Sequence, residues 1–105
     1  MKPQQPPYYA VIFTSIKNEN NEGYEEWDND LFELVKQEPG YIGHESYRNA
    51  DGKGVTISYW KDLESLSHWR NNPQHQQAQE LGMQKWYEHY RIRVCKVERD
   101  YEFSS

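Results

Sequence analysis

The chain has 105 residues, which is enough for one domain with a single core. Only 18 residues are Leu, Ile, Val or Phe, but 15% of the chain is aromatic and the net charge is a modest −5, which excludes a disordered chain. The pI near 5.3 excludes a nucleic-acid-binding protein, because phosphate contacts need a basic surface. The apolar surface is therefore carried mainly by rings, which serve equally well as core or as walls for a flat ligand.

Membrane insertion and secretion are not expected. The sequence has no window of 18 apolar residues that could span a bilayer. Residues 1–7 are rich in Pro and Gln, lack the apolar segment of a signal peptide, and are expected to form a disordered lead-in. The single cysteine, Cys95, cannot form an internal disulfide, which indicates a reducing cytoplasm.

The first half of the chain predicts a strand, a helix and a hairpin. Residues 8–16 are β-branched and aromatic with apolar side chains at both parities, as in a strand that is covered on both faces. The turn-rich residues 18–23 end this strand, and residues 24–35 have apolar side chains at helical spacing. Residues 41–47 and 54–60 predict two strands that are joined at residues 49–52.

The second half predicts a broken helix and a last strand. Asp62 is placed to cap a short helix, and Asn72, followed by Pro73, is placed to cap a second one that runs to about Tyr90. Residues 91–103 alternate loosely and predict a strand.

This order predicts an α+β fold, the ferredoxin-like split βαββαβ arrangement with an antiparallel sheet. Residues 8–103 form its single domain. Both helical regions pack on one face of such a sheet, so the other face of the first strand needs a cover. A second copy of the same sheet is the simplest cover, which predicts a homodimer.

Motifs for several common chemistries are missing. None of the four histidines has zinc-like spacing, and no protein-held metal site is expected. The sequence also has no nucleophile elbow, P-loop or dinucleotide-binding glycine motif.

The most informative stripe lies on the third helical region. His75, Gln79, Gly82 and Trp86 fall at i, i+4, i+7 and i+11, which places them on one helix face. An imidazole, an amide and a glycine are unusual on a core face. The stripe is therefore either a pocket wall or ordinary packing in which Gly82 admits a neighbouring ring. Trp69 is placed either in the core or in a cleft between helices and sheet.

This pattern resembles a known family. The run Ser58-Tyr59-Trp60, then Trp69 and His75, and the helix through Gly82 to Trp86-Tyr87 are similar to the antibiotic biosynthesis monooxygenase (ABM) domain. The resemblance covers about residues 8–103. It implies a dimeric α+β barrel with a pocket in each subunit. Members include cofactor-independent monooxygenases of phenolic compounds and haem-degrading monooxygenases.

The haem-degrading branch matches only in part. Trp60-Lys61-Asp62 and Trp69 agree with that branch, but Gln79 stands where it has a histidine haem ligand. Its first-strand asparagine is also absent, since the corresponding stretch has Thr14 and Ser15. Haem therefore remains an alternative cofactor, and the favoured prediction is an enzyme without one.

The resemblance and the stripe together predict a cofactor-independent monooxygenase that oxidises a small aromatic or phenolic metabolite with O₂. His75 acts as base or hydrogen-bond partner, because its ordinary pKa of about 6.5 suits proton transfer near neutral pH. Gln79 orients a substrate oxygen and Trp69 forms an apolar wall. The expected substrate-binding residues are Ser15, Phe13, Trp27, Tyr59, Gly82 and Trp86. The alternatives are a haem-binding or haem-degrading monooxygenase and a non-catalytic dimer that binds a small molecule.

Overall fold

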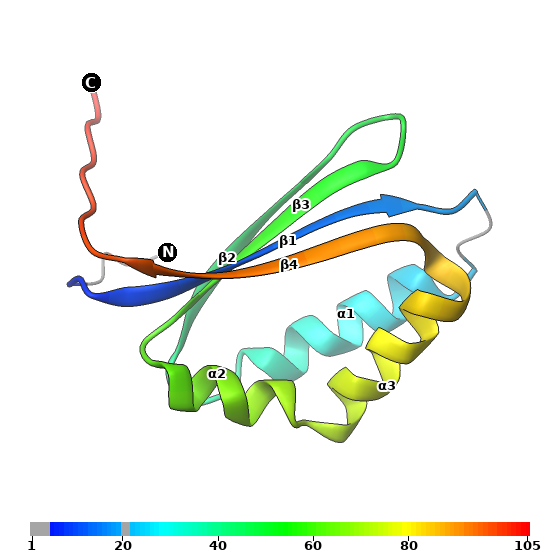
Figure 1. The fold of residues 1–105 in the computed structure, drawn as a ribbon, viewed down its shortest axis with the longest axis horizontal. Helices are drawn as coiled ribbons and strands as arrows, with labels where there is room; N and C mark the ends of the chain where they lie inside the picture. Colours follow the sequence, from blue (N-terminus) through cyan, green and yellow to red (C-terminus); the bar gives the residue numbers. More distant parts are fainter. Residues whose placement is uncertain (1–4, 20–21) are drawn as a thin grey trace.

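A four-stranded antiparallel sheet forms one layer of the molecule and three helices form the other (Figure 1). The computed structural model describes residues 5–19 and 22–105. The strand order is β2-β3-β1-β4. The strands are β1 (Tyr8–Lys17), β2 (Tyr41–Arg48), β3 (Lys53–Trp60) and β4 (Tyr87–Val97). The predicted ferredoxin-like α+β fold is confirmed.

The helices are α1 (Tyr24–Val35), α2 (Leu63–Arg70) and α3 (Pro73–Leu81), and α3 continues into one π-helical turn, η1 (Gly82–Trp86). Two predicted caps are confirmed. The Asp62 carboxylate accepts a hydrogen bond from the Ser65 backbone N–H, and the Asn72 side chain accepts from the N–H groups of Gln74 and His75. None of the helices in the described residues is long and apolar enough to cross a membrane.

Two predicted boundaries are wrong. The third helical region does not run to Tyr90, because the backbone becomes extended at Tyr87, directly after η1. The last strand therefore starts at Tyr87 and ends at Val97 rather than at Phe103. The segment after β4 runs away from the sheet on the side opposite the helices (Figure 1).

Strand alternation divides the side chains of β1 between two faces. Val11 and Phe13 face the helices and line the hollow beneath them. Tyr8, Ala10 and Ile12 have the other parity and lie on the outer face, which no helix covers (Figure 1). The described residues thus leave the apolar outer side chains of β1 without a second layer, and the cover that the two-sided pattern of β1 predicts stays a prediction.

The core lies where α1 and α2 meet the sheet. Trp60, at the end of β3, is only 1% exposed and packs with Val35 and Trp69. Its indole N–H donates to the Ser58 hydroxyl at 3.0 Å, which satisfies the polar atom of a buried ring. Large rings thus take the place of the missing aliphatic side chains. This core joins α1 and α2 to the end of β3.

Candidate active site

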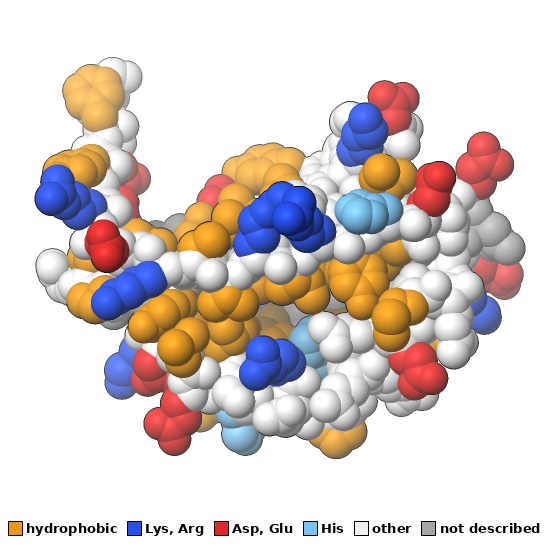
Figure 2. Space-filling view, in the orientation of Figure 1, with side chains coloured by type: hydrophobic (Ala, Val, Ile, Leu, Met, Phe, Trp, Pro, Cys, Tyr) orange, Lys and Arg blue, Asp and Glu red, His pale blue; other side chains and the backbone are white. Residues whose placement is uncertain are grey.

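A cavity of about 250 Å³ lies between the helices and the sheet. Figure 2 shows it as a hollow below the sheet, rimmed by hydrophobic side chains, with a histidine visible in it. Most of its lining is apolar or aromatic, which suits a flat organic ligand. The polar side chains that line it are Asp28, His44, Thr56, Ser58, Arg70, His75 and Gln79.

Aromatic rings that pack against one another form one wall of this cavity. Phe13 on β1 lies 5.4 Å from the ring of Tyr87 and 5.4 Å from that of Tyr90. Tyr24 on α1 packs edge-on against Trp86 at 5.6 Å, and Trp27 lies 6.3 Å from Trp86. Rings held by other rings keep their positions without a ligand, so this wall is preorganised.

His75 lies in the first turn of α3 and contributes an imidazole to the cavity. Its ring stacks on Trp69 with centroids 4.7 Å apart. The ring lies near the backbone carbonyls of Arg70 and Trp69, but its buried Nδ1 forms no well-aligned hydrogen bond within the described part of the chain. Burial lowers the pKa of His75, which outweighs the opposite effect of the backbone carbonyls of Arg70 and Trp69. The ring is therefore neutral at pH 7 and able to accept a proton.

The structure brings together the three residues expected to carry the chemistry. Gln79 follows His75 by one helical turn, and both line the cavity together with Trp69. Three of the expected substrate-binding residues, Phe13, Trp27 and Trp86, line the same cavity.

The other three expected substrate-binding residues lie elsewhere. Tyr59 is on the outer face of the sheet, where its hydroxyl donates to Glu45 at 2.6 Å. Gly82 is buried against a ring, since a Cβ there would lie 2.9 Å from Cδ2 of Tyr87. Ordinary packing thus accounts for this glycine. Ser15 is 3% exposed and its hydroxyl accepts a hydrogen bond from Arg48 at 2.8 Å.

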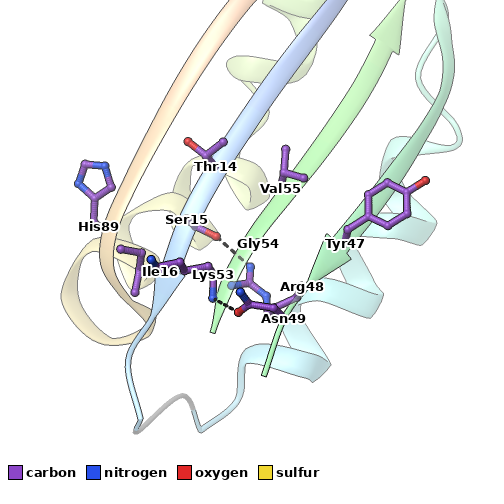
Figure 3. A pocket seen from close by; sticks show the side chains of 10 residues that line it. All are labelled: Thr14, Ser15, Ile16, Tyr47, Arg48, Asn49, Lys53, Gly54, Val55 and His89. Carbon is purple, nitrogen blue, oxygen red and sulfur yellow. Dashed lines mark hydrogen bonds between the residues drawn. The ribbon is translucent and has the colours of Figure 1, made fainter. Parts of the chain in front are cut away.

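Ser15 lines a second, more open hollow of about 660 Å³ at the β2–β3 hairpin (Figure 3). Arg48 there also donates to the Gly52 carbonyl, and the Asn49 side chain accepts from the Lys53 backbone N–H at 3.0 Å. These hydrogen bonds serve the hairpin itself. The enclosed cavity is the better candidate site, because it has more ring walls and an unpartnered polar atom.

Two proton-accepting residues of the cavity were missed by the sequence reasoning, Asp28 on α1 and His44 on β2. Asp28 could have been found, because it lies four residues after Tyr24 and three before Leu31 on the apolar face of the helix. His44 had no comparable signal. Its ring stacks on Phe32 at 4.3 Å, a contact between α1 and β2 that spacing along the chain does not reveal.

The described residues contain no group of three or more His, Cys, Asp or Glu that could hold a metal ion. Among the residues that line the cavity, the proton-accepting groups are the imidazoles of His44 and His75 and the carboxylate of Asp28. This set can accept protons from a ligand and hydrogen-bond to it.

The two cavity histidines predict how stability depends on pH. Burial lowers the pKa of both His44 and His75, so the unfolded chain binds protons more readily than the folded one. Their contribution is complete above the unfolded pKa of about 6.5 and is lost as the pH falls through the folded values. We expect the free energy of unfolding to fall between pH 7 and pH 5, and less steeply in His75→Phe. Urea titrations across this range measure it, and an unchanged slope in the variant would contradict the assignment.

Comparisons with known proteins agree with this architecture. The family described as antibiotic biosynthesis monooxygenase (ABM) matches residues 7–81. The chain is 49% identical over 98 residues to the uncharacterised protein YqjZ of Bacillus subtilis, covering 93% of this chain and 86% of that protein. A jasmonate monooxygenase of Pyricularia oryzae is 35% identical over 60 residues, which are 55% of this chain and only 28% of that enzyme.

Among solved structures, SnoaB from Streptomyces nogalater, described as a cofactor-independent oxygenase, superposes with a TM-score of 0.75. The match covers 90% of this chain and 97% of SnoaB at 11% identity, so it shows a shared fold. The family match and the fold agree with the resemblance carried by Trp60, Trp69 and His75. The chain belongs to the antibiotic biosynthesis monooxygenase family.

Proposed function

We propose that this protein is a cofactor-independent monooxygenase that oxidises a small aromatic or phenolic metabolite with O₂ in the cavity between helices and sheet. The observation that carries the proposal is the His75 imidazole, which stacks on Trp69 in a ring-lined cavity and has a buried, unpartnered Nδ1. A neutral imidazole in an apolar site can take a proton from an acidic substrate while the surrounding rings hold the resulting anion flat.

The substrate anion supplies the electrons in this reaction. At a CH₂ group that is acidified by conjugation with a carbonyl group, two C–H bonds break and a C=O bond forms to one atom of O₂. The other oxygen atom leaves as water with the two hydrogens, so no external reductant is needed. His75 accepts the first proton, and Gln79, one turn further along α3, is placed to orient a substrate oxygen.

The proposed functional unit is a homodimer that forms through the outer face of the sheet. The four-stranded sheet has helices on one side only (Figure 1), and its outer face carries Ile12, Ile57 and Tyr59. Tyr101 and Phe103 are 86% and 88% exposed in the segment that projects on the same side. Partly exposed apolar side chains on a sheet face, next to two exposed rings, are typical of an interface, and self-pairing of one patch gives a closed dimer.

Oxygen consumption tests the enzymatic proposal. Purified protein is incubated with a panel of anthrone-type and polyphenolic compounds, with a metal chelator and without added cofactor, in an oxygen electrode. We expect uptake of one O₂ per product, and a product that has gained one oxygen and lost two hydrogens. Binding of these compounds without oxygen uptake would instead support a non-catalytic binding protein. A Soret shift on titration with hemin, together with activity only in the haem-loaded protein, would contradict cofactor independence.

A further inference from the structure

Asp28 places a carboxylate in the wall of the cavity. It lies on the inward face of α1, half-buried, between Tyr24 and Leu31, which line the cavity with it. It makes no hydrogen bond or ion pair with any residue that the structure describes. Burial raises the pKa of Asp28, and this outweighs the opposite influence of Lys17, His44 and Arg48. A carboxylate in such a position gains free energy when a hydrogen-bond donor reaches it.

The two cationic side chains near Asp28, Arg48 and Lys17, contact other groups. Arg48 donates to the Ser15 hydroxyl at 2.8 Å and to the Gly52 carbonyl at 2.5 Å. The Lys17 ammonium lies 3.6 Å from the centre of the Tyr24 ring, in a cation–π contact. Neither cation forms a direct salt bridge with Asp28 in the described part of the chain, although both lie near enough to lower its pKa.

His44 is likewise held by its own contacts. Its Nδ1 forms a short hydrogen bond with the Tyr41 hydroxyl, and its ring stacks on Phe32 with an interplanar angle of 6°. Burial lowers the pKa of His44, so the ring is neutral at pH 7. Asp28 is consequently an open hydrogen-bond acceptor at the α1 side of the cavity.

The charge of Asp28 selects the chemistry of a ligand. An anionic ligand group beside Asp28 would be repelled by the carboxylate, whereas a group that carries a hydrogen-bond donor would be attracted to it. A hydroxyl supplies the hydrogen bond that the carboxylate lacks, and it is the donor that the phenolic ligand of the proposed function carries. A hydrogen bond to a charged acceptor is also stronger than one between neutral groups.

We propose that Asp28 is a specificity-determining residue that accepts a hydrogen bond from a hydroxyl group of the aromatic ligand, so that the cavity selects hydroxylated over O-methylated rings. This inference rests on the proposed function, because that function supplies the aromatic ligand. It adds a polar contact from α1 to the His75 and Gln79 contacts from α3. The substrate class is then an aromatic compound with a free hydroxyl in addition to the group that faces His75.

Two probes that differ in a single methyl group test this inference. The protein, labelled with ¹⁵N, is titrated with 2-naphthol and with 2-methoxynaphthalene, and binding is followed by amide and indole shifts. In the wild type we expect 2-naphthol to bind about tenfold more tightly, as one hydrogen bond to a charged acceptor implies. In Asp28→Asn this preference falls, because the neutral amide oxygen is a weaker acceptor than the carboxylate. Asp30→Asn is the matched control, because Asp30 is an exposed carboxylate on the same helix and its loss leaves the preference unchanged.

The position of the ligand hydroxyl in the cavity can be measured in the wild-type protein, without a variant. Ring protons flanking the hydroxyl of bound 2-naphthol are expected to show NOE contacts to Tyr24 and Leu31, the cavity residues on either side of Asp28. The inference is overturned if neither probe binds, if the wild type has no preference, if these contacts are absent, or if Asp28→Asn keeps the preference. A fall in the preference in Asp28→Asn without any oxygen uptake in the enzyme assay would contradict the proposed function but support the role of Asp28. Oxygen uptake by the wild type, together with an unchanged preference in Asp28→Asn, would support the proposed function but contradict the role of Asp28.

Discussion

Replacing His75 by phenylalanine is expected to lower the turnover number by about 10²–10⁴, the usual contribution of a general base. Phenylalanine keeps a ring against Trp69, so the 4.7 Å stacking contact is retained while the proton-accepting nitrogens are removed. The measurement is the initial rate of O₂ consumption with a substrate identified in the oxygen-electrode screen, at saturating substrate concentration.

The matched control for this experiment is His68→Phe. His68 lies on α2 with 73% of its side chain exposed and contacts Glu38 at 2.7 Å, outside the cavity. We expect this variant to turn over at the wild-type rate, and both variants to unfold cooperatively. Full turnover in His75→Phe would refute the assignment of His75 as base. A rise in KM with an unchanged turnover number would limit its role to substrate binding.

Replacing Ile57 by lysine is expected to convert the proposed dimer into a monomer. Ile57 lies on the outer face opposite Ile12 on β1 and Glu45 on β2. In the monomer the lysine can pair with Glu45 at the surface, where an ion pair has little effect on stability. In a dimer through this face, the ammonium would lose its water, which costs several kcal/mol. Light scattering coupled to size-exclusion chromatography measures the mass directly.

Gln77→Lys serves as the control for the added charge, because Gln77 is exposed on α3, in the helical layer rather than on the outer face. It is expected to leave the mass unchanged. A wild-type protein that is monomeric at all concentrations would contradict the dimer. A dimeric, folded Ile57→Lys variant would show that another surface mediates association.

Local signals in the sequence were sufficient to predict most of the elements. Asp62 and Asn72 cap their helices through their own side chains, and such caps depend on residues only two or three positions away. The end of the third helical region was not predictable in this way. The Asn18 backbone N–H donates to the Trp86 carbonyl and the Asn18 side chain to the Lys85 carbonyl, both at 2.8 Å. A residue more than sixty positions away thus holds the carbonyls that end this helical region.

The residues of the candidate site were likewise only partly predictable from local signals in the sequence. His75 and Gln79 share a helix face by the 3.6-residue period, and the same period predicts Trp86 beside them. Tyr59 and Ser15 were expected at the ligand but lie elsewhere. Strand parity places Tyr59 on the outer face, and a hydrogen bond to Arg48 holds Ser15 at the hairpin. A strand sequence that is apolar on both sides does not say which side faces the helices.

The sequence by itself determined the family, the order of the elements, and the use of aromatic rings in place of aliphatic side chains. These properties follow from composition and from periods of two and 3.6 residues, which act over short distances along the chain. Only the tertiary structure decided that Asp28 and His44 line the same cavity as His75. The reason is physical: α1 brings Asp28 and β2 brings His44, and their shared position depends on how a helix docks on a sheet, which involves contacts between residues far apart in the chain.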